Sequence, residues 1–521
     1  MEPTRPNAIT LRNARVWTGD PSRPHATSVT LRGGVIEAVG AAPSQANGAH
    51  GETIDLGGRW VGPAFIDSHL HITLGAATLA QCDLSACASR EDFERRIAAH
   101  RAKLDDAGQR DAWLVAFGWN EADWRGEAPT GAWLAATDRP AVAWRMDQHS
   151  CVVNDAALAL LDTSPIDGGE IEPERGVFRE QAAWKRVIPA IPAPSVAAKR
   201  VNLARATVYL HSLGLAAGGS MEYLCDIRDV YIPSLDALSF RVHATVLDRD
   251  WPLDAPPALP SESSDFFRIV GFKSFADGTL GSRTAWMLEP YADAPHTSGL
   301  AMEHTLRGEL SAWMRAVQRT GLSPAVHAIG DRAARELIDA FDACADAPAP
   351  RFEHAQTLHP REIPRMAGRF ASMQPLHKAD DARLALSRLG PARIERFFAF
   401  RALLAHGARL AFGSDWPIVS PDPLLGIKAA VTGLDLDGRL FATEHSIGVE
   451  EALVAYTRTA AEMLGFPGGM LREGRAADLV VLDRSPFEVD WTRELPRIDG
   501  TIVGGRTVFE RTPMLRATGA R

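Results

Sequence analysis

Eight short apolar runs recur along the middle of the chain, and helix-like stretches separate most of them. Each run has the length and composition of a buried strand. Alternation of strand and helix over this distance is typical of a parallel sheet covered by helices, and eight strands favour a closed (β/α)8, or TIM, barrel. The runs are 64–70, 215–221, 240–247, 269–276, 323–327, 351–354, 370–375 and 409–414. We therefore predict an α/β fold built on this barrel.

Both ends of the chain have a different sequence pattern, which predicts short strands joined by glycine-rich turns. Residues 28–39 form a plausible hairpin around Gly33-Gly34, and residues 501–509 form another. We expect the two ends to assemble into one small β domain made of residues 1–61 and 468–521.

The barrel is then expected to occupy residues 62–467. A large insertion at about 76–214 follows its first strand and contains two further strand-like runs, at 113–119 and 141–146. This gives one large domain and a smaller one, as expected for a chain of 521 residues.

Composition excludes several classes of protein. The formal net charge of −9 is mild for this length and argues against a nucleic-acid-binding surface or a polybasic membrane patch. Five cysteines without a close pair fit a reducing compartment. No run reaches about 18 apolar residues, and the N-terminus does not resemble a signal peptide. We expect a cytoplasmic protein that acts on a small molecule, with no nucleic-acid or membrane partner, and we allow for a homodimer.

Two histidines, His69 and His71, end the first predicted barrel strand. Residues i and i+2 of a strand point to the same face, so both imidazoles project together from its carboxyl end. Seen alone, this pair fits two polar loop histidines as well as it fits two nitrogen ligands of a divalent metal.

Polar side chains also end other predicted strands, where barrel enzymes carry their chemistry. Seen singly, Lys273 reads as a solvated lysine, His327 and His354 as hydrogen-bonded core histidines, and Asp415 as the cap of a turn. Six such groups at strand ends of one barrel make coincidence a poor explanation. Together they can hold two cations if the lysine carries CO2 as a carbamate and bridges them.

The chain resembles the amidohydrolase superfamily, in particular its type 3 branch, which includes N-substituted formamide deformylases. The matching stretches follow the expected order along nearly the whole chain. They are 62–71, 272–284, 327–333, 353–356, 413–417 and 477–480.

This resemblance implies a metal-dependent barrel with a β-sandwich built from both termini. It assigns His69, His71 and Asp415 to one metal and His327 and His354 to the other. Lys273 is implied as the bridging N6-carboxylysine. Glu180 in the insertion is a further candidate, as a metal ligand or a substrate contact. The expected cofactor is one or two divalent ions, with zinc first.

A second cluster lies in the insertion. Arg145, Asp147 and His149 alternate along a predicted strand, so they share a face. This face is either a surface strand of mixed charge or a wall facing the substrate, in which His149 hydrogen-bonds a carbonyl or its oxyanion. Trp119 supplies an apolar pocket or belongs to the core, and we favour the core. His377 completes the set of predicted substrate contacts.

The predicted activity is metal-assisted hydrolysis of a C–N bond in an N-formyl, N-acyl or cyclic amide. Asp415 is the predicted general base, and His149 or Arg283 helps to polarise the carbonyl. The alternatives on the same scaffold are a deaminase and a lactone, ester or phosphotriester hydrolase. A mononuclear deaminase typically carries His-x-x-Glu on strand five, whereas Gly330 stands three residues after His327. A non-catalytic scaffold protein is expected to have lost a ligand, and all six are present.

Overall fold

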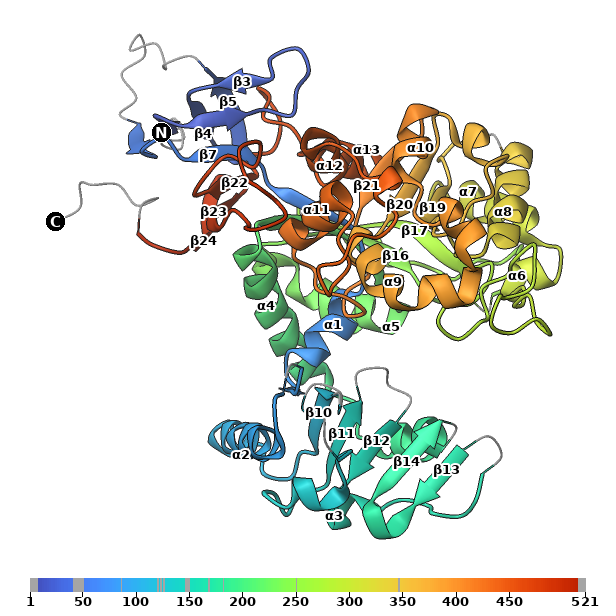
Figure 1. Ribbon diagram of the computed structural model, residues 1–521. Coiled ribbons are helices and arrows are strands. Elements are labelled where there is room, and N and C mark those ends of the chain that lie inside the picture. Colours follow the sequence, from blue (N-terminus) through green and yellow to red (C-terminus); the bar gives the residue numbers. More distant parts are fainter. Residues whose placement is uncertain are drawn as a thin grey trace. The chain divides into compact units, whose positions relative to one another are not determined.

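The computed structural model describes most of the chain, except for the side chains of Glu180 and Arg383 and several short segments. The described residues are 8–40, 51–85, 87–119, 121, 124, 127–145, 150–166, 169–180, 182–249, 251–344 and 347–513. They form two compact units, which are described separately (Figure 1). The larger comprises Met1–Gly75 and Leu203–Arg521, and the smaller, the inserted unit, comprises Ala76–Asn202.

A barrel-like sheet of eight parallel strands dominates the described part of the larger unit, and the strands are neighbours in chain order. Backbone N–H groups of Ser414 and Asp415 donate to the carbonyl of His69, at 3.2 and 2.6 Å, where the last strand meets the first. The strands are β8 (Phe65–Leu70), β15 (Leu215–Glu222), β16 (Arg241–Val246), β17 (Phe267–Phe275), β18 (Ser323–Ala328), β19 (Arg351–His354), β20 (Phe370–Met373) and β21 (Arg409–Phe412). All eight predicted strands are confirmed.

Helices of the larger unit pack their apolar faces inward. In α7, for example, Leu310, Trp313, Met314 and Val317 are buried at the i, i+3, i+4, i+7 spacing of one helix face. The helices are α1 (Ile72–Thr78), α5 (Leu224–Asp226), α6 (Glu303–Leu306), α7 (Leu310–Arg319), α8 (Asp331–Ala343), α9 (Pro375–Leu389), α10 (Phe400–Ala405), α11 (Pro423–Thr432), α12 (Val449–Ala455) and α13 (Arg458–Leu464). Two helices, α1 and α4 (Val196–Ser212), span the limits between the two units.

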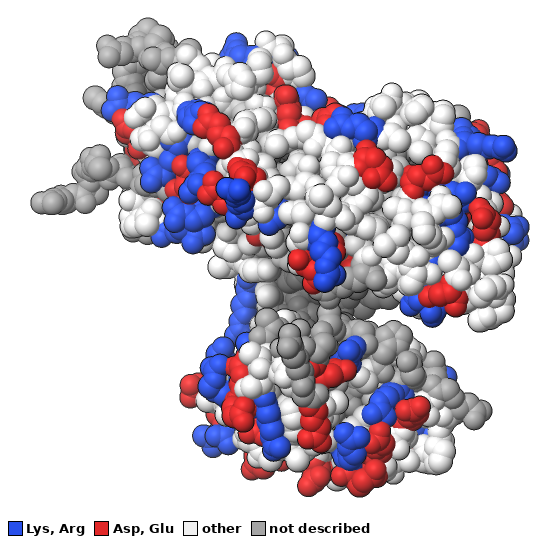
Figure 2. Space-filling view, viewed as in Figure 1, with Lys and Arg blue, Asp and Glu red and all other residues white. Residues whose placement is uncertain are grey.

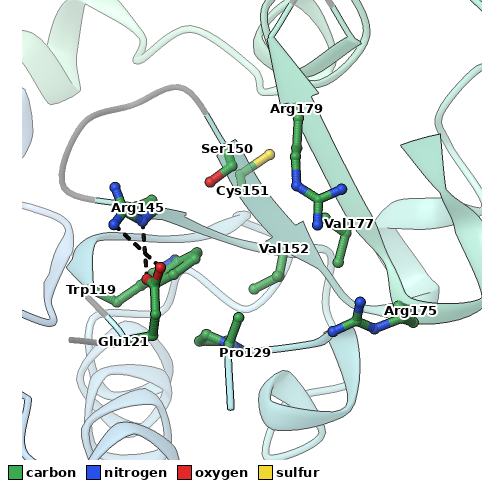
Figure 3. A pocket seen from close by; sticks show the side chains of 11 residues that line it. Trp119, Glu121, Pro129, Arg145, Ser150, Cys151, Val152, Arg175, Val177 and Arg179 are labelled. Atoms are coloured by element: carbon green, nitrogen blue, oxygen red, sulfur yellow. Dashed lines mark hydrogen bonds and ion pairs between the residues drawn. The ribbon is translucent and has the colours of Figure 1, made fainter. Parts of the chain in front are cut away.

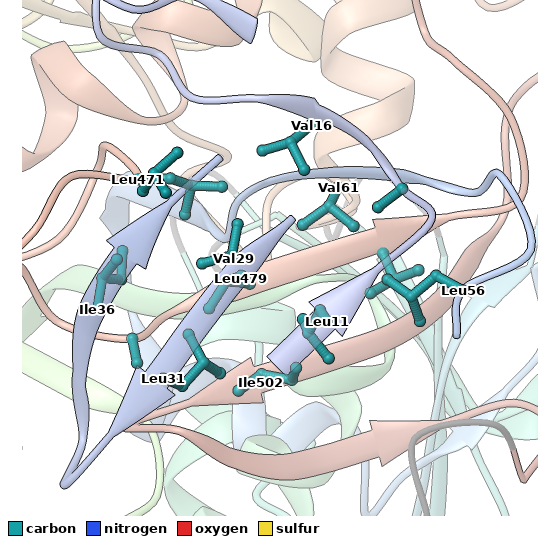
Figure 4. Close-up of a cluster of buried hydrophobic side chains, with 14 of the residues drawn as sticks. Leu11, Val16, Val29, Leu31, Ile36, Leu56, Val61, Leu471, Leu479 and Ile502 are labelled. Atoms are coloured by element: carbon teal, nitrogen blue, oxygen red, sulfur yellow. The ribbon is translucent and has the colours of Figure 1, made fainter. Parts of the chain in front are cut away.

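Two further sheets of the larger unit enclose a separate apolar core, part of which Figure 4 shows. One sheet has the order β5 (Val35–Val39), β4 (Val29–Arg32), β1 (Ile9–Arg12), β6 (Glu52–Asp55). The other has the order β24 (Arg506–Glu510), β23 (Ile498–Val503), β22 (Leu479–Leu482), β7 (Trp60–Pro63), β2 (Arg15–Trp17), β3 (His25–Ala26).

Strands from both ends of the chain share the second of these sheets. Strand β22 pairs antiparallel with β7, and Leu479 lies opposite Pro63. Leu11, Val29, Val61 and Leu479 contribute to the common core. The predicted fold, a TIM barrel with a β-sandwich from both termini, is therefore confirmed, while the limits 1–61, 62–467 and 468–521 stay predictions.

The inserted unit is built on a mixed sheet with the order β13 (Gly169–Glu172), β14 (Val177–Glu180), β12 (Ser150–Val153), β11 (Ala141–Arg145), β10 (Leu114–Trp119), β9 (Cys82–Asp83). Helix α2 (Arg90–Asp106) packs Phe93 and Ile97 against one face, and α3 (Asp155–Leu158) follows β12. Strands β10 and β11 were predicted. The shorter ones were missed because segments such as Gly169–Glu172 carry charges and little apolar pattern.

Charged side chains of both signs are interspersed on the described surface that Figure 2 shows. Within the described ranges, no helix is both long and apolar enough to cross a membrane.

Candidate active site

Six side chains predicted from the sequence converge at the carboxyl ends of the barrel strands. They reach this edge from β8, β17, β18 and β19 and from the segment after β21. Four of them are buried, and His71 and Asp415 are partly exposed. They are His69, His71, Lys273, His327, His354 and Asp415.

One half of the cluster has the geometry of a metal site. The Nε2 atoms of His69 and His71 lie 3.4 and 3.1 Å from Oδ1 of Asp415. The three potential ligand atoms all lie within 4.8 Å of one another. Two imidazole nitrogens and a carboxylate oxygen at this spacing suit a divalent cation such as zinc.

The other half adjoins it. The rings of His327 and His354 have centroids 4.5 Å apart, and the ring of His354 lies 4.9 Å from that of His69. Nζ of Lys273 lies 3.5 Å from Nε2 of His69. The lysine therefore stands beside a histidine of the first group.

Three of the histidines are anchored through one ring nitrogen. Nδ1 of His69 lies 2.7 Å from Oε2 of Glu353, and Nδ1 of His354 lies 2.9 Å from Oε1 of Gln374. Nε2 of His327 lies 3.0 Å from the carbonyl oxygen of Gly278. Because each partner is an acceptor, the anchored nitrogen of the neutral imidazole carries the proton and the other nitrogen keeps its lone pair, as a metal ligand requires.

Glu353 is a functional residue that the sequence analysis did not single out. Its Oε1 lies 2.7 Å from Nη2 of Arg351, and both side chains are buried. Burial opposes ionisation of Glu353, but Arg351, His69 and Lys273 hold its pKa well below the usual value. The sequence did contain a signal for this residue. Arg351 and Glu353 carry opposite charges two residues apart in a predicted buried strand, and buried charges need partners.

The backbone around the first group is fixed by Asp67. Its carboxylate accepts the N–H groups of His69 and Ser414 at 3.0 and 3.1 Å and the hydroxyl of Ser414 at 2.6 Å. Gly413 approaches so closely that an added Cβ would lie 2.5 Å from the backbone nitrogen of His69. Asp415 itself has a φ of 57°, a conformation that the surrounding contacts must hold.

Burial shifts the pKa values of these groups, and neighbouring charges add to that shift or oppose it. Burial lowers the pKa of His327 to about 3, with help from Lys273, and the pKa of Lys273 to about 8. Burial by itself raises the pKa of Asp415, but His69, His71 and His354 lower it well below its usual value.

His69 differs from His327 because its pKa is raised. Burial and Lys273 lower its pKa, but Glu353 and Asp415 raise it by more. A proton therefore competes with a cation for His69 more strongly than it would at a histidine with the usual pKa.

The remaining predicted site residues belong to the inserted unit, which is described by itself, or to other parts of the larger unit. Asp147 and His149 lie outside the described residues. Glu180 ends β14 of the inserted unit, and nothing is described of its side chain. Trp119 is buried in the core of that unit. Arg145 pairs with Glu121 at 3.0 Å (Figure 3).

Arg283 and His377 belong to the larger unit. The guanidinium of Arg283 donates through Nε and Nη2 to both oxygens of Asp293, at 3.1 and 2.9 Å. His377 lies in α9, shortly after β20, and its Nε2 is buried without a hydrogen-bond partner among the described residues.

Comparison with known proteins identifies the family to which this chain belongs. The profile of the Amidohydrolase family matches residues 52–509, which include all six residues of the cluster. The chain belongs to the amidohydrolase family. This confirms the resemblance seen in the sequence.

This amidohydrolase is similar to several described proteins. It is 31% identical to the putative amidohydrolase YtcJ of Bacillus subtilis, over 88% of this chain and 91% of that protein. It is 24% identical to an N-substituted formamide deformylase of Arthrobacter pascens, over 98% and 99% of the two chains. A metal-dependent hydrolase from Pyrococcus horikoshii has a similar structure, with a TM-score of 0.77, 27% identity and coverage of 94% and 100%. The chain is therefore a hydrolase of a metal-dependent family.

We expect Glu353→Gln to weaken metal binding by about 10–100-fold, the usual cost of losing a carboxylate behind a histidine ligand. Glutamine still accepts a hydrogen bond from His69 but no longer makes the imidazole more basic. Titration of the metal-free protein with zinc against a competing chelator measures the affinity. Glu336→Gln, on an exposed position of α8, is the matched control. Equal affinities in both variants would show that Glu353 has no such role.

Proposed function

We propose that this amidohydrolase cleaves an amide-type C–N bond in a small molecule, such as an N-formyl, N-acyl or cyclic amide. The observation that carries the proposal is the ionised carboxylate of Asp415, held beside His69 and His71 at the carboxyl edge of the barrel. The near full-length similarity to a formamide deformylase supports the choice of bond.

The residues present fit one or two divalent cations. His69, His71 and Asp415 would hold one, His327 and His354 the other, and Lys273 would bridge them as a carbamate. Imidazole and carboxylate ligands suit zinc and also other transition metals. Such a cation, when bound, lowers the pKa of a water molecule and polarises a carbonyl group.

Asp415 is the proposed general base. Its carboxylate takes a proton from the attacking water and passes it to the departing nitrogen. Because its pKa is held low, the carboxylate is ionised at neutral pH and ready to accept that proton. His149 or Arg283 is the proposed donor to the carbonyl oxygen. Since Nε and Nη2 of Arg283 donate to Asp293, this arginine would donate to the carbonyl through Nη1.

The substrate contacts in the proposal are Arg145, Asp147, Trp119 and His377. Of these four residues, His377 belongs to the larger unit, and its Nε2, which has no partner among the described residues, would make the polar contact with the substrate. The remaining parts of the proposal are a cytoplasmic location, a small-molecule partner without nucleic acid or membrane, and a homodimer.

Profiling against matched substrates tests the reaction class. N-formyl, N-acyl and cyclic amides are compared with lactones, esters, phosphotriesters and aminated heterocycles, with amine, acid and ammonia measured as products. We expect amine release from at least one amide class at the highest kcat/KM. Ammonia release alone would identify a deaminase, and preference for esters would reject the proposed bond.

We expect Lys273→Ala to lose the second metal equivalent and most activity, with partial rescue by added bicarbonate or a short-chain carboxylate. Burial lowers the pKa of Lys273 to about 8, so a sizeable fraction is the neutral amine that carbamate formation needs. Metal content by elemental analysis and activity with and without carboxylate measure the effect. Lys428→Ala, on α11 and away from the barrel edge, serves as the control. A Lys273→Ala variant with full metal content and rate would make this lysine structural.

A further inference from the structure

Helix α1 begins directly after His71, so the helix and this proposed metal ligand share one stretch of backbone. The carbonyl oxygen of His71 accepts the N–H of Gly75 at 2.7 Å, which makes His71 the N-cap residue of α1. The N–H of His71 donates to the carbonyl oxygen of Trp416 at 2.9 Å. The position of the His71 side chain therefore depends on how the first turn of α1 is held.

The side chain of His71 does not satisfy the first turn of its own helix. The first N–H groups of a helix have no partner inside it, and the side chain of the N-cap residue often accepts one of them. The imidazole of His71 instead directs Nε2 toward Oδ1 of Asp415, at 3.1 Å. The N–H groups that follow His71 must therefore find their acceptors elsewhere in the fold.

Strand β15 supplies these acceptors. Oγ of Ser220 accepts the N–H of Ile72 at 3.0 Å, and Oε1 of Glu222 accepts the N–H of Thr73 at 3.1 Å. Both acceptors lie at the carboxyl end of β15, which is the neighbour of β8 in the barrel. They do for α1 what the side chain of an N-cap residue does for other helices.

Glu222 is itself held firmly at one oxygen. Its Oε1 also accepts the hydroxyl groups of Ser220 at 2.5 Å and Tyr231 at 2.7 Å. The Glu222 side chain is buried, and so are the two side chains that donate to it. Burial of a carboxyl group is costly unless it is hydrogen-bonded, and three donors on one oxygen fix its place. Oε1 of Glu222 is thereby a rigid acceptor for the N–H of Thr73.

We propose that Glu222 is a positioning residue for His71 and acts on it through the first turn of α1. The other three histidines of the cluster are each anchored through a ring nitrogen by an acceptor. Among the described residues, Nδ1 of His71 has no such acceptor, so the backbone on both sides of His71 has to place its ring. This inference rests on the metal site of the proposed function.

The proposal separates two substitutions of Glu222. Leucine removes the acceptor of the Thr73 N–H, so the first turn of α1 and His71 with it lose a fixed position. Glutamine keeps an oxygen for the three donors that Oε1 now binds. Its amide nitrogen takes the place of Oε2, which accepts no hydrogen bond from the described residues. The acceptor is therefore required, and the negative charge is not.

Titration of the metal-free, full-length protein with zinc against a competing chelator measures the effect. We expect Glu222→Leu to weaken zinc binding at least about tenfold, as for other residues that orient a metal ligand, and Glu222→Gln to stay within about threefold of the wild type. Tyr231→Phe is the matched control. It removes a buried hydrogen bond to Glu222 but leaves both acceptors of α1 in place, so it should bind zinc as the wild type does.

A double-mutant cycle with His71→Ala tests whether Glu222 acts through that histidine. In the His71→Ala background, Glu222→Leu should no longer weaken zinc binding, because the ligand that Glu222 positions is gone. A general structural role of Glu222 would weaken binding equally in both backgrounds. Visible absorption of the cobalt-substituted variants reports the ligand geometry. We expect Glu222→Leu to change the spectrum in the same direction as His71→Ala, and Glu222→Gln to keep the wild-type spectrum.

The outcomes distinguish this inference from the metal site on which it rests. Wild-type zinc affinity in Glu222→Leu, or an equal loss in Tyr231→Phe, would overturn the inference and leave the metal site in place. A wild type that binds neither zinc nor cobalt would overturn both. Circular dichroism checks that each variant folds. If Glu222→Leu does not fold, Ser220→Ala removes the acceptor of the Ile72 N–H and should weaken zinc binding in its place.

Discussion

Asp415→Asn is expected to lower kcat by about 10²–10⁴-fold while most of the bound metal is retained. Asparagine keeps the shape of the side chain and one oxygen near Nε2 of His71, where Oδ1 now lies at 3.1 Å. It cannot accept the proton of the attacking water. Steady-state kinetics on an amide that the wild type hydrolyses, with metal content measured in the same samples, give the result.

Asp339→Asn is a suitable control for this variant, since Asp339 lies exposed on α8 and pairs with Arg365. A rate within a few-fold of the wild type for Asp415→Asn would remove Asp415 as the base. The general base would then be His149 or Glu180, which both belong to the inserted unit.

Removal of bound metal is expected to lower activity at least about a hundredfold and to leave the fold intact. Metal coordination typically lowers the pKa of water from about 16 to about 7, and the ionised carboxylate of Asp415 alone does not supply that activation. The barrel has its own buried core, so circular dichroism should change little. Dialysis against a chelator, elemental analysis and re-addition of zinc give the measurement.

Recovery of activity on adding zinc distinguishes metal loss from damage by the chelator. Calcium, which prefers oxygen ligands, is the control cation and should not restore the rate. A preparation shown to be metal-free and still fully active would contradict the assignment of the barrel edge as a metal site.

The barrel and its six polar side chains were predictable because each signal is local. An apolar run predicts a strand, and the residue that ends it, such as His327, is placed by that strand. Parallel strands then bring their carboxyl ends to one edge, so the six residues meet without any knowledge of loop shape.

The partners of these residues were not predictable in the same way. His69 and Glu353 meet across the barrel although they are far apart in the chain, and Gln374 approaches His354 from the next strand. Arg283 could not be known to pair with Asp293, because that contact depends on the path of a loop without regular strands or helices. Loop geometry is fixed by tertiary packing, which composition and periodicity do not report.

The pairing of β7 with β22 bears on how the protein is made. The strand that leads into the first barrel strand, and so to His69 and His71, can pair early with β2, but its other neighbour forms only when residues 479–482 have left the ribosome. Until then an apolar edge that includes Val61 stays uncovered on the growing chain, where unpaired strands favour aggregation. Synthesis of this protein should therefore depend on chaperones that hold early segments, and slow translation should lower its yield more than that of a protein whose first domain closes on itself.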